Sequence, residues 1–425
     1  MLENKLRQIF GDKLKKISDV ADVVCGPFGS AIKNTDYRES GIPLIRITNI
    51  SKDGYMNYDD LIFISEELGN SLSRTQVSSG DIVVSQRGSL GQCAIVDDAF
   101  PKINISANII AIKNLRGVSA TFLHDFFLST IGQTLLERSV SGQVQQKITT
   151  QDIADLVIPI DTNEESLTSL INKAHESYKS KLRQADELLV DFETEISQKF
   201  NFDTLTENKL CIAIRLKDCD GVIDAKRYMG GKRKSDLTLG DVCDIVEEKE
   251  NVANYQNEVI DWIRIDDLPN NPLEIETVRT LSANEMDGTF FKVQEGDILV
   301  ARLGPTILNK KTVMVRKTER NTLASAEFLV LRCKKGFNAE SVMAVLKTEY
   351  YKNLMYSNSR GSTPSRYRLN REDALKLPFP DISALQEDIA YKAVEISKKS
   401  RQLRLEAEQE WAAAKAQFEK ELLGE

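Results

Sequence analysis

The sequence predicts an α+β fold in which two similar domains are separated by two long antiparallel helices that form an intramolecular coiled coil. The first observation is a repeat: residues 80–84 (GDIVV) return at 296–300 (GDILV). The second is a long amphipathic segment after each copy, and the third is a set of short strand-like runs between turn signals. The two copies lie much farther apart than the 20–50 residues of a solenoid repeat, so the repetition indicates a duplicated domain.

These observations divide the chain into four parts. The first domain is predicted over 1–160, the first spacer helix over 161–200, the second domain over 201–380 and the second spacer helix over 381–425. The domains contain separate short strands and helices rather than a βαβ series, which is why we assign them to the α+β class.

The first domain contains three apolar runs that are typical of strands, at 42–47, 81–85 and 108–112. Tight turns are predicted at 26–29 (GPFG), before the first run, and at 87–91 (RGSLG), after the second. A single helix is predicted over 120–137, because the segment is apolar and contains no Pro.

The first spacer helix has a narrow apolar stripe with steps of three and four residues, close to that of a coiled coil. Its members are Leu167, Ile171, Ala174, Tyr178, Leu182, Ala185, Leu189, Phe192 and Ile196. Asp161 or Thr162 can cap the start of this helix. A stripe of this length extends beyond any small domain, so we expect another helix to cover it.

The second domain repeats the order of the first. Strands are predicted at 262–265, 297–301 and 327–332, and one helix is predicted over 339–356. The second spacer helix then carries a matching stripe from Ile382 to Leu422. We expect the two stripes to cover each other in antiparallel orientation; the alternatives are that each helix lies across its own domain or pairs with another chain.

The composition limits the classes of function. The chain has 425 residues, 41% hydrophobic and 28% charged, and no run is long and apolar enough for a membrane helix. Its six cysteines form no CxxC pair, which argues against a disulfide framework or a zinc site. We therefore expect reduced thiols in a cytoplasmic protein. The net charge is −8, yet basic residues gather at 226–234, 301–320 and 352–371, either as solvated surface or as local anion-binding patches.

A polar loop follows the predicted helix in each domain. Residues 141–147 (SGQVQQK) carry glutamines, whereas residues 360–368 (RGSTPSRYR) carry arginines. Gln suits bidentate contact with adenine and Arg with guanine, so one scaffold with different loops would read two different DNA sequences. The alternative is a pair of unrelated surface loops.

The motifs and their order resemble those of a known family. These motifs are GPFGSAIK at 26–33, GIPLIR at 41–46, GDIVVSQRG at 80–88 and their counterparts in the second half of the chain. In them, the chain is similar to the specificity subunit of type I restriction–modification systems. The second domain departs from the pattern, because residues 238–241 (TLGD) precede no GPFGS-like turn.

This resemblance implies a non-catalytic subunit that binds double-stranded DNA, with each domain reading one half of a bipartite target. The helices would set the spacing and dock two methyltransferase subunits and restriction subunits. S-adenosylmethionine, ATP and Mg would be bound by those partners, and this chain would hold no cofactor, no metal and no catalytic residue.

Twelve residues are candidates for DNA contact: Arg46, Arg87, Gln143, Gln145, Gln146, Lys147, Arg264, Arg302, Ser362, Thr363, Arg366 and Arg368. Arg46 and Arg264 lie in predicted strands, so the alternative for both is a structural ion pair with an acid.

Enzyme functions have little support. His124 and His175 are the only histidines, no GxxxxGK[ST] phosphate loop is present, and residues 247–249 (EEK) resemble a nuclease motif only faintly. Two alternatives to the type I assignment stay open: a specificity module of another restriction–modification type, and a coiled-coil interaction protein that does not bind DNA.

Overall fold

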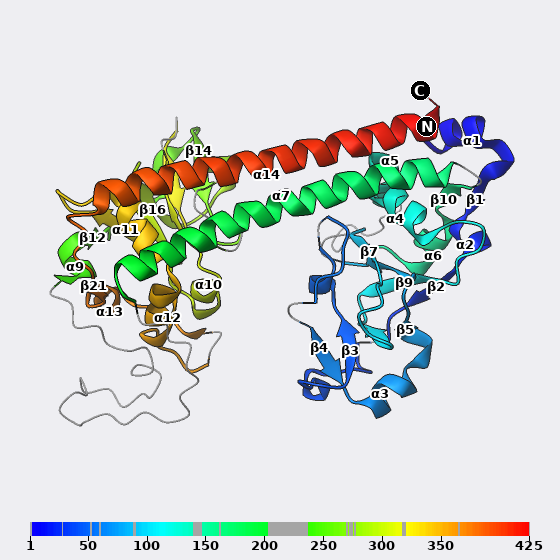
Figure 1. The fold of residues 1–425 in the computed structure, drawn as a ribbon, viewed down its shortest axis with the longest axis horizontal. Coiled ribbons are helices and arrows are strands. Elements are labelled where there is room, and N and C mark those ends of the chain that lie inside the picture. The colour runs from blue at the N-terminus through cyan, green and yellow to red at the C-terminus, as the bar shows by residue number, and fades with distance from the viewer. Residues whose placement is uncertain are drawn as a thin grey trace. The chain divides into compact units, whose positions relative to one another are not determined.

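The computed structural model describes residues 2–27, 29–51, 53–58, 61–87, 91–138, 147–160, 163–202, 237–268, 271, 275, 278–316, 320–363 and 366–424. The chain forms two compact units. Unit 1 comprises Met1–Lys181 and Glu406–Glu425, and unit 2 comprises Leu182–Leu405. The two long helices, α7 (Glu164–Lys199) and α14 (Gln386–Leu423), contribute to both units (Figure 1).

Unit 1 is built around two four-stranded sheets. The first is antiparallel, in the order β2 (Asp22–Cys25), β9 (Ile109–Lys113), β6 (Ile82–Ser85) and β7 (Cys93–Ile95). The second has the order β4 (Ile62–Ile64), β3 (Ile42–Ile45), β8 (Ile103–Ile105) and β5 (Gln76–Val77), and its β3–β8 pair is parallel. Alternating apolar residues such as Ile45, Val83 and Ile105 are fully buried and form a shared core.

Shorter elements complete unit 1. A two-stranded ladder joins β1 (Leu14–Lys16) to β10 (Val157–Pro159), so the two ends of the domain are paired. The helices are α1 (Leu2–Phe10), α2 (Ile17–Val20), α3 (Glu66–Ser71), α4 (Ala120–Leu128), α5 (Thr130–Arg138) and α6 (Thr150–Asp155).

Unit 2 repeats this topology. One antiparallel sheet has the order β12 (Cys243–Ile245), β20 (Phe328–Cys333), β17 (Ile298–Ala301) and β18 (Thr312–Met314). The other has five strands, in the order β13 (Lys249–Asn251), β16 (Thr289–Val293), β19 (Thr322–Ala324), β14 (Val259–Ile263) and β15 (Arg279–Ser282). Its β14–β19 pair is parallel, as is β3–β8 in unit 1, so the repeat in the sequence corresponds to a repeated fold.

Apart from α10, the remaining elements of unit 2 have counterparts among the described elements of unit 1. Strands β11 (Leu237–Thr238) and β21 (Pro378–Phe379) form the closing ladder. The helices are α9 (Leu239–Val242), α10 (Gly304–Leu308), α11 (Ala339–Leu346), α12 (Glu349–Ser357) and α13 (Arg371–Leu375).

The expectation of one helix over 120–137 is wrong, because the segment is broken at Ser129. This residue is extended, with φ −70° and ψ 160°, and its hydroxyl accepts a hydrogen bond from the Gly132 amide at 3.1 Å. The expectation of one helix over 339–356 is wrong for the same reason, since Thr348 is extended between α11 and α12. An apolar run without Pro gives no sign of either break.

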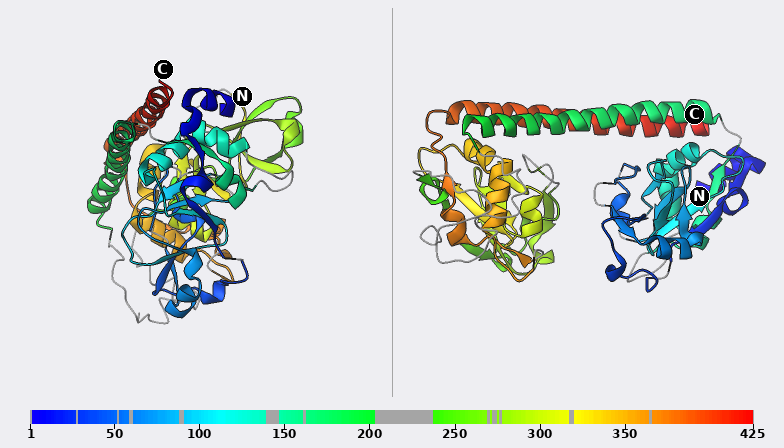
Figure 2. Two further views of the ribbon diagram at one scale, coloured as in Figure 1. Left: turned by 90° about the vertical axis from the view of Figure 1, so that its right-hand side faces the viewer. Right: turned by 60° about the horizontal axis from the view of Figure 1, so that its bottom comes forward.

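The predicted antiparallel pairing of the long helices is confirmed within each unit. In unit 1, Lys181 of α7 forms ion pairs with Glu406 and Glu410 of α14 at 3.2 and 2.6 Å. In unit 2, Lys199 forms an ion pair with Asp388 at 2.7 Å. Residue numbers therefore rise along α7 as they fall along α14, and the two ribbons run side by side in both views of Figure 2.

Candidate nucleic-acid interface

Two adjoining cavities of unit 1 lie where strands β2 and β6 end and β9 begins. The larger, here called the Arg87 cavity, has a volume of about 750 Å³, and the smaller, the Arg46 cavity, about 410 Å³. They share four lining residues, namely Pro27, Gly29, Ala107 and Asn108. The two cavities therefore adjoin each other at these shared residues.

The backbone turn at Gly26 shapes this surface. A Cβ atom at Gly26 would lie 1.9 Å from the carbonyl oxygen of Ser106, so only glycine permits this approach of the two loops. The Gly26 amide also donates to the carbonyl of Ile109 at 2.8 Å. The first glycine of the GPFG sequence is thus explained by the close packing of two loops at the edge of the sheet.

The charge of these cavities is of one sign. Arg74, Arg87 and Lys147 line the Arg87 cavity and Arg46 lines the Arg46 cavity, whereas no carboxylate occurs among the described lining residues. Arg74, Arg87 and Lys147 form no ion pair with any described residue. In a chain of net charge −8, such a concave group of cations fits an anionic ligand.

Backbone hydrogen bonds hold three segments together at the Arg87 cavity. The amide of Gln86 donates to the carbonyl of Asn108 at 2.9 Å, and the amide of Ile148 donates to the carbonyl of Gln86 at 3.1 Å. Thr149 then caps α6, and its hydroxyl accepts from the Asp152 amide at 3.1 Å. The backbone of Lys147 is therefore held at the Arg87 cavity by the hydrogen bond of Ile148 and by the helix cap at Thr149.

The structure brings together some of the predicted contact residues of unit 1. Arg87 and Lys147 line one cavity, and Arg46 lines the adjoining one. The predicted Gln143, Gln145 and Gln146 lie outside the described residues.

The structure adds Arg74 and Asn108 to this group. Arg74 comes from a short 3-10 helix (Ser73–Thr75), and Asn108 from the turn before β9. Arg74 belongs to no charged cluster and to no duplicated motif, and Asn108 opens a predicted strand, so neither side chain was marked as a contact by the sequence.

The same hydrogen-bond pattern recurs in unit 2. The amide of Arg302 donates to the carbonyl of Glu327 at 3.3 Å, and the amide of Leu369 donates to the carbonyl of Arg302 at 2.8 Å. Three positions thereby correspond: Gln86 to Arg302, Asn108 to Glu327 and Lys147 to Arg368. The backbones of the two units match here, but the side chains differ in charge and shape.

Carboxylates accompany the cations at the equivalent place in unit 2. Arg368 donates to the carboxylate of Glu327 at 3.1 Å, and Arg371 pairs with Glu247 at 2.8 Å. Burial, together with the neighbouring Arg368, lowers the pKa of the Arg302 guanidinium. Unit 2 therefore presents a network of alternating charges, whereas unit 1 presents cations.

The other predicted residues of unit 2 lie on exposed or half-exposed positions. Arg264 pairs with Asp266 at 3.0 Å and lies over the ring of Trp262 at 5.2 Å from its centroid. Ser362, Thr363 and Arg366 are exposed on the loop between α12 and α13.

Two further features of the sequence have different outcomes. The basic cluster at 226–234 lies outside the described residues. At the nuclease-like motif, Glu247 pairs with Arg371 and Lys249 lies over the ring of Phe291 at 4.8 Å. In the described part of the chain, no group of three His, Cys, Asp or Glu residues is placed to hold a metal ion.

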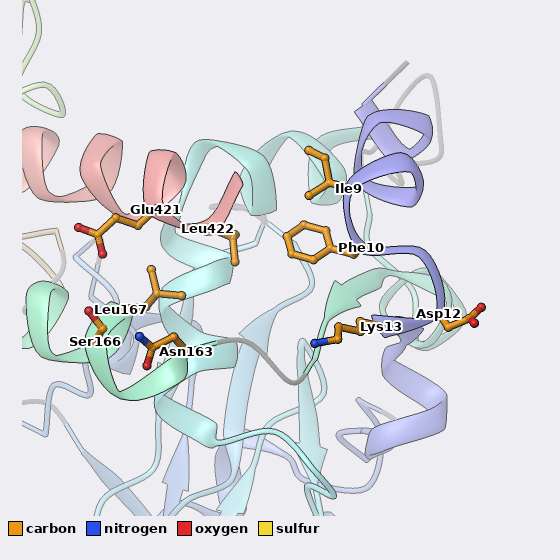
Figure 3. Close-up of a pocket in the computed structure, with 9 residues that line it drawn as sticks. All are labelled: Ile9, Phe10, Asp12, Lys13, Asn163, Ser166, Leu167, Glu421 and Leu422. Atoms are coloured by element: carbon orange, nitrogen blue, oxygen red, sulfur yellow. The ribbon is translucent and has the colours of Figure 1, made fainter. Parts of the chain in front are cut away.

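A further cavity of unit 1 has a different character. It has a volume of about 670 Å³ and lies between α1, the start of α7 and the end of α14 (Figure 3). Phe10 and Leu422 point toward each other across it, and Asp12, Lys13 and Glu421 lie around its rim. Its mixture of apolar groups and carboxylates does not fit a polyanion.

Over part of its length, the chain is related to a curated protein. The specificity subunit of the type I restriction enzyme EcoBI from Escherichia coli is 28% identical over 128 residues. The match covers 30% of this chain and 27% of that protein. No protein-family model matches the sequence. Among the described helices, none combines the length and the apolar character needed to cross a membrane.

Solved structures are similar over nearly the whole chain. A chain from a structure of the type I R-M system matches with a TM-score of 0.42 and 15% identity, covering 96% of both chains. The S subunit of a type I restriction–modification system from M. genitalium matches with a TM-score of 0.39 and 13% identity, covering 96% of this chain and 95% of its own. The curated match confirms the resemblance predicted from the sequence: the chain is similar to the specificity subunit of a type I restriction–modification enzyme.

Proposed function

We propose that this chain is a DNA-reading, non-catalytic specificity subunit of a type I restriction–modification complex. Each domain reads one half of a bipartite target, and the helices set the spacing. The helices also dock two methyltransferase subunits and restriction subunits, which bring S-adenosylmethionine, ATP and Mg. The observation that carries the proposal is the pair of adjoining cavities in unit 1, which Arg46, Arg74, Arg87 and Lys147 line without a carboxylate among the described lining residues.

Electrostatics supports a nucleic-acid ligand over a protein ligand at this surface. A DNA duplex carries one negative charge for about every 1.7 Å of its axis, so several cations in one concave surface contact several phosphates at once. Phosphate contacts fix the register of a protein on the duplex, while side chains that reach base edges supply specificity.

The equivalent positions of the two units support unlike half-sites. Asn108 presents a carboxamide, which suits the donor and acceptor of adenine, at the position where Glu327 presents a carboxylate, which suits the amino group of cytosine. Lys147 faces phosphates as a point charge, whereas Arg368 at the equivalent position suits guanine. One scaffold with different side chains thus reads two different sequences.

The proposal is tested by removing two cations from the Arg87 cavity. In the double variant Arg74→Ala/Arg87→Ala, we expect weaker binding to all DNA sequences. The slope of log K against log salt concentration should fall by about 2, which corresponds to two lost phosphate contacts. Binding is measured by fluorescence anisotropy on labelled duplexes over a range of salt concentrations.

A control with the same change in charge is the double variant Lys15→Ala/Lys173→Ala, because both lysines are exposed outside the cavities. Binding and salt slope should stay at the wild-type values in this variant. Equal losses in the two double variants would reject the cavity as the phosphate site, and salt-independent association with a protein partner alone would favour the interaction protein.

The type of restriction–modification system is decided by the partners. We expect the chain to co-purify with a methyltransferase subunit when the two are expressed together. Methylated bases would then appear at a two-part sequence in host DNA only when this chain is present. Methylation that does not depend on the chain would contradict the assignment.

A further inference from the structure

Cys243 and Cys333 face each other in the first sheet of unit 2. They are direct partners in the antiparallel ladder of β12 and β20, and their sulfur atoms lie 3.6 Å apart. Cys243 is buried and Cys333 is half-buried, and both thiols are free in this structure. The two residues are separated by 90 positions in the sequence, so their proximity is a product of the fold.

The flanking backbone bonds show which kind of pair this is. The Lys334 amide donates to the carbonyl of Val242 at 2.9 Å, and the Val246 amide donates to the carbonyl of Val330 at 2.8 Å. Hydrogen-bonded and non-hydrogen-bonded pairs alternate along an antiparallel ladder, so Cys243 and Cys333 form a non-hydrogen-bonded pair. The Cα atoms of such pairs are about 4.5 Å apart, which falls within the range that a disulfide spans.

We propose that Cys243 and Cys333 are a modification site at which hydrogen peroxide forms a reversible disulfide between β12 and β20. The Cys333 thiolate attacks one oxygen of the peroxide, the O–O bond breaks, hydroxide leaves, and Cys333 becomes a sulfenic acid. The sulfur of Cys243 then attacks the sulfur of Cys333, and the hydroxyl group leaves with the Cys243 proton as water. The hydroxide takes up the proton that the Cys333 thiol released on ionising, so two thiols are oxidised and one hydrogen peroxide is reduced to two water molecules.

The surroundings assign the first step to Cys333. This side chain is half-buried and reachable from solvent, whereas Cys243 is buried. The hydrogen bond with Cys333 and burial both raise the pKa of the Cys243 thiol, which keeps it protonated until the sulfenic acid forms beside it.

The bond would secure an edge strand. β12 lies at the edge of its sheet, where β20 is its neighbour, so the strand depends on one ladder and on side-chain packing. A disulfide there closes a loop of 90 residues and reduces the conformational entropy of the unfolded chain. Local opening of the sheet edge under oxidising conditions would then be suppressed.

The experiment treats the full-length protein with hydrogen peroxide and maps its peptides without reduction. We expect one linked peptide pair that contains Cys243 and Cys333, together with the loss of two titratable thiols. The midpoint of thermal unfolding of unit 2 should rise on the order of 10 °C and return to its starting value after dithiothreitol.

The matched variants are Cys333→Ser, which should abolish both the link and the rise, and Cys25→Ser, which removes another half-buried thiol and should abolish neither. Cys333→Ala repeats the test in case the serine hydroxyl disturbs the sheet. Oxidation of Cys333 to a sulfinic acid without a link, or a link from Cys333 to a different cysteine, would overturn the proposal. The outcome does not depend on DNA binding, so it is distinct from the test of the proposed function.

Discussion

At the scale of single residues, both histidines of the chain contact one tyrosine in unit 1. His175 of α7 stacks on the ring of Tyr55, and His124 of α4 meets the same ring edge-on at 5.5 Å. His124 also bonds the carbonyl of Gly54 through Nε2 at 2.6 Å. The histidines thus belong to the contact between α4, α7 and the loop that carries Tyr55.

This contact predicts a dependence of stability on pH. Burial lowers the pKa of His175 below its usual 6.5, and the positive charge of Lys179 lowers it further. The carboxylates of Asp53, at 3.9 Å, and of Glu176 act in the opposite direction but do not cancel the decrease. The unfolded chain therefore binds the proton more readily, so the stability present above pH 6.5 should be lost as the pH falls. The slope should be at most about 1.4 kcal/mol per pH unit.

The measurement is urea unfolding of the protein between pH 7.5 and pH 5, read at Trp411, whose ring packs 5.8 Å from that of His175. The variant His175→Gln should remove most of the slope in this range. Burial raises the pKa of Asp125, which acts in the opposite direction. An unchanged slope in His175→Gln would assign the pH dependence to other groups.

A second buried contact fixes α7 in unit 2. Glu193 pairs with Lys310 and accepts from the side-chain amide of Asn271 at 3.1 Å, and the two charged side chains are only 12% and 15% exposed. Nearby, full burial of Lys347 lowers the pKa of its ammonium to about 7.

We expect Glu193→Ala to destabilise unit 2 by about 2 kcal/mol, because it removes the nearer and more buried of the two carboxylates that pair with Lys310 and leaves only the exposed Glu349 at 3.2 Å. The control is Glu195→Ala, whose pair with Lys392 is more than a third exposed and should cost less than about 1 kcal/mol. Both values come from denaturant unfolding with the same probe. Equal costs for the two variants would contradict the special role of the buried pair.

At the scale of elements, the repeated helix breaks define how the domains are closed. α4 and α5 meet at Ser129, and α11 and α12 meet at Thr348, each of which is extended. Gly132 permits the first junction, since a Cβ atom there would lie 2.0 Å from the carbonyl oxygen of Phe126. The break, and not the helix propensity of the run, places α5 against the domain.

The junction gives a prediction for Gly132→Ala. The added methyl group would collide with backbone that cannot move without displacing a helix, so we expect a loss of about 2 kcal/mol or more in the stability of unit 1. Gly29→Ala serves as the control, because a Cβ atom there meets nothing within 4 Å. Thermal unfolding of both variants measures the difference, and similar midpoints would argue against a constrained junction.

At the scale of the whole molecule, each long helix contributes one half to each unit. The ion pairs of Lys181 belong to unit 1 and those of Lys199 to unit 2, and both follow from one continuous α7. Under the proposed function, the stretch of helix between these pairs sets the distance between the two half-sites on DNA.

Seven residues inserted into both α7 and α14, between the ion pairs of Lys181 and those of Lys199, keep the apolar stripes of the two helices in phase. We expect the preferred gap between half-sites to lengthen by about 3 base pairs, since seven helical residues span about 10 Å. Selection from DNA libraries with gaps of variable length measures the preference. The same seven residues added after Gly424 should leave it unchanged, and an unchanged gap in the doubly lengthened variant would reject the role of the helices as a spacer.

The sequence predicted much of the fold and part of the site. The duplicated strands, the two long helices and their antiparallel pairing follow from periodicity and repetition, because a face that is apolar over many turns must be covered. Arg87 and Lys147 could be selected because they lie in duplicated motifs. Arg74 and Asn108 could not, since their place beside the cavity depends on loops that the chain brings together from distant positions.

The sequence alone determined the class of the fold, the duplication and the similarity to a specificity subunit, because hydrophobic periodicity and motif order are local properties of the chain. The tertiary structure decided which residues are neighbours. It placed four cations of unit 1 around two adjoining cavities, paired the arginines of unit 2 with carboxylates, and set Cys243 opposite Cys333. Such contacts depend on strand register and loop approach, which involve residues far apart in the chain.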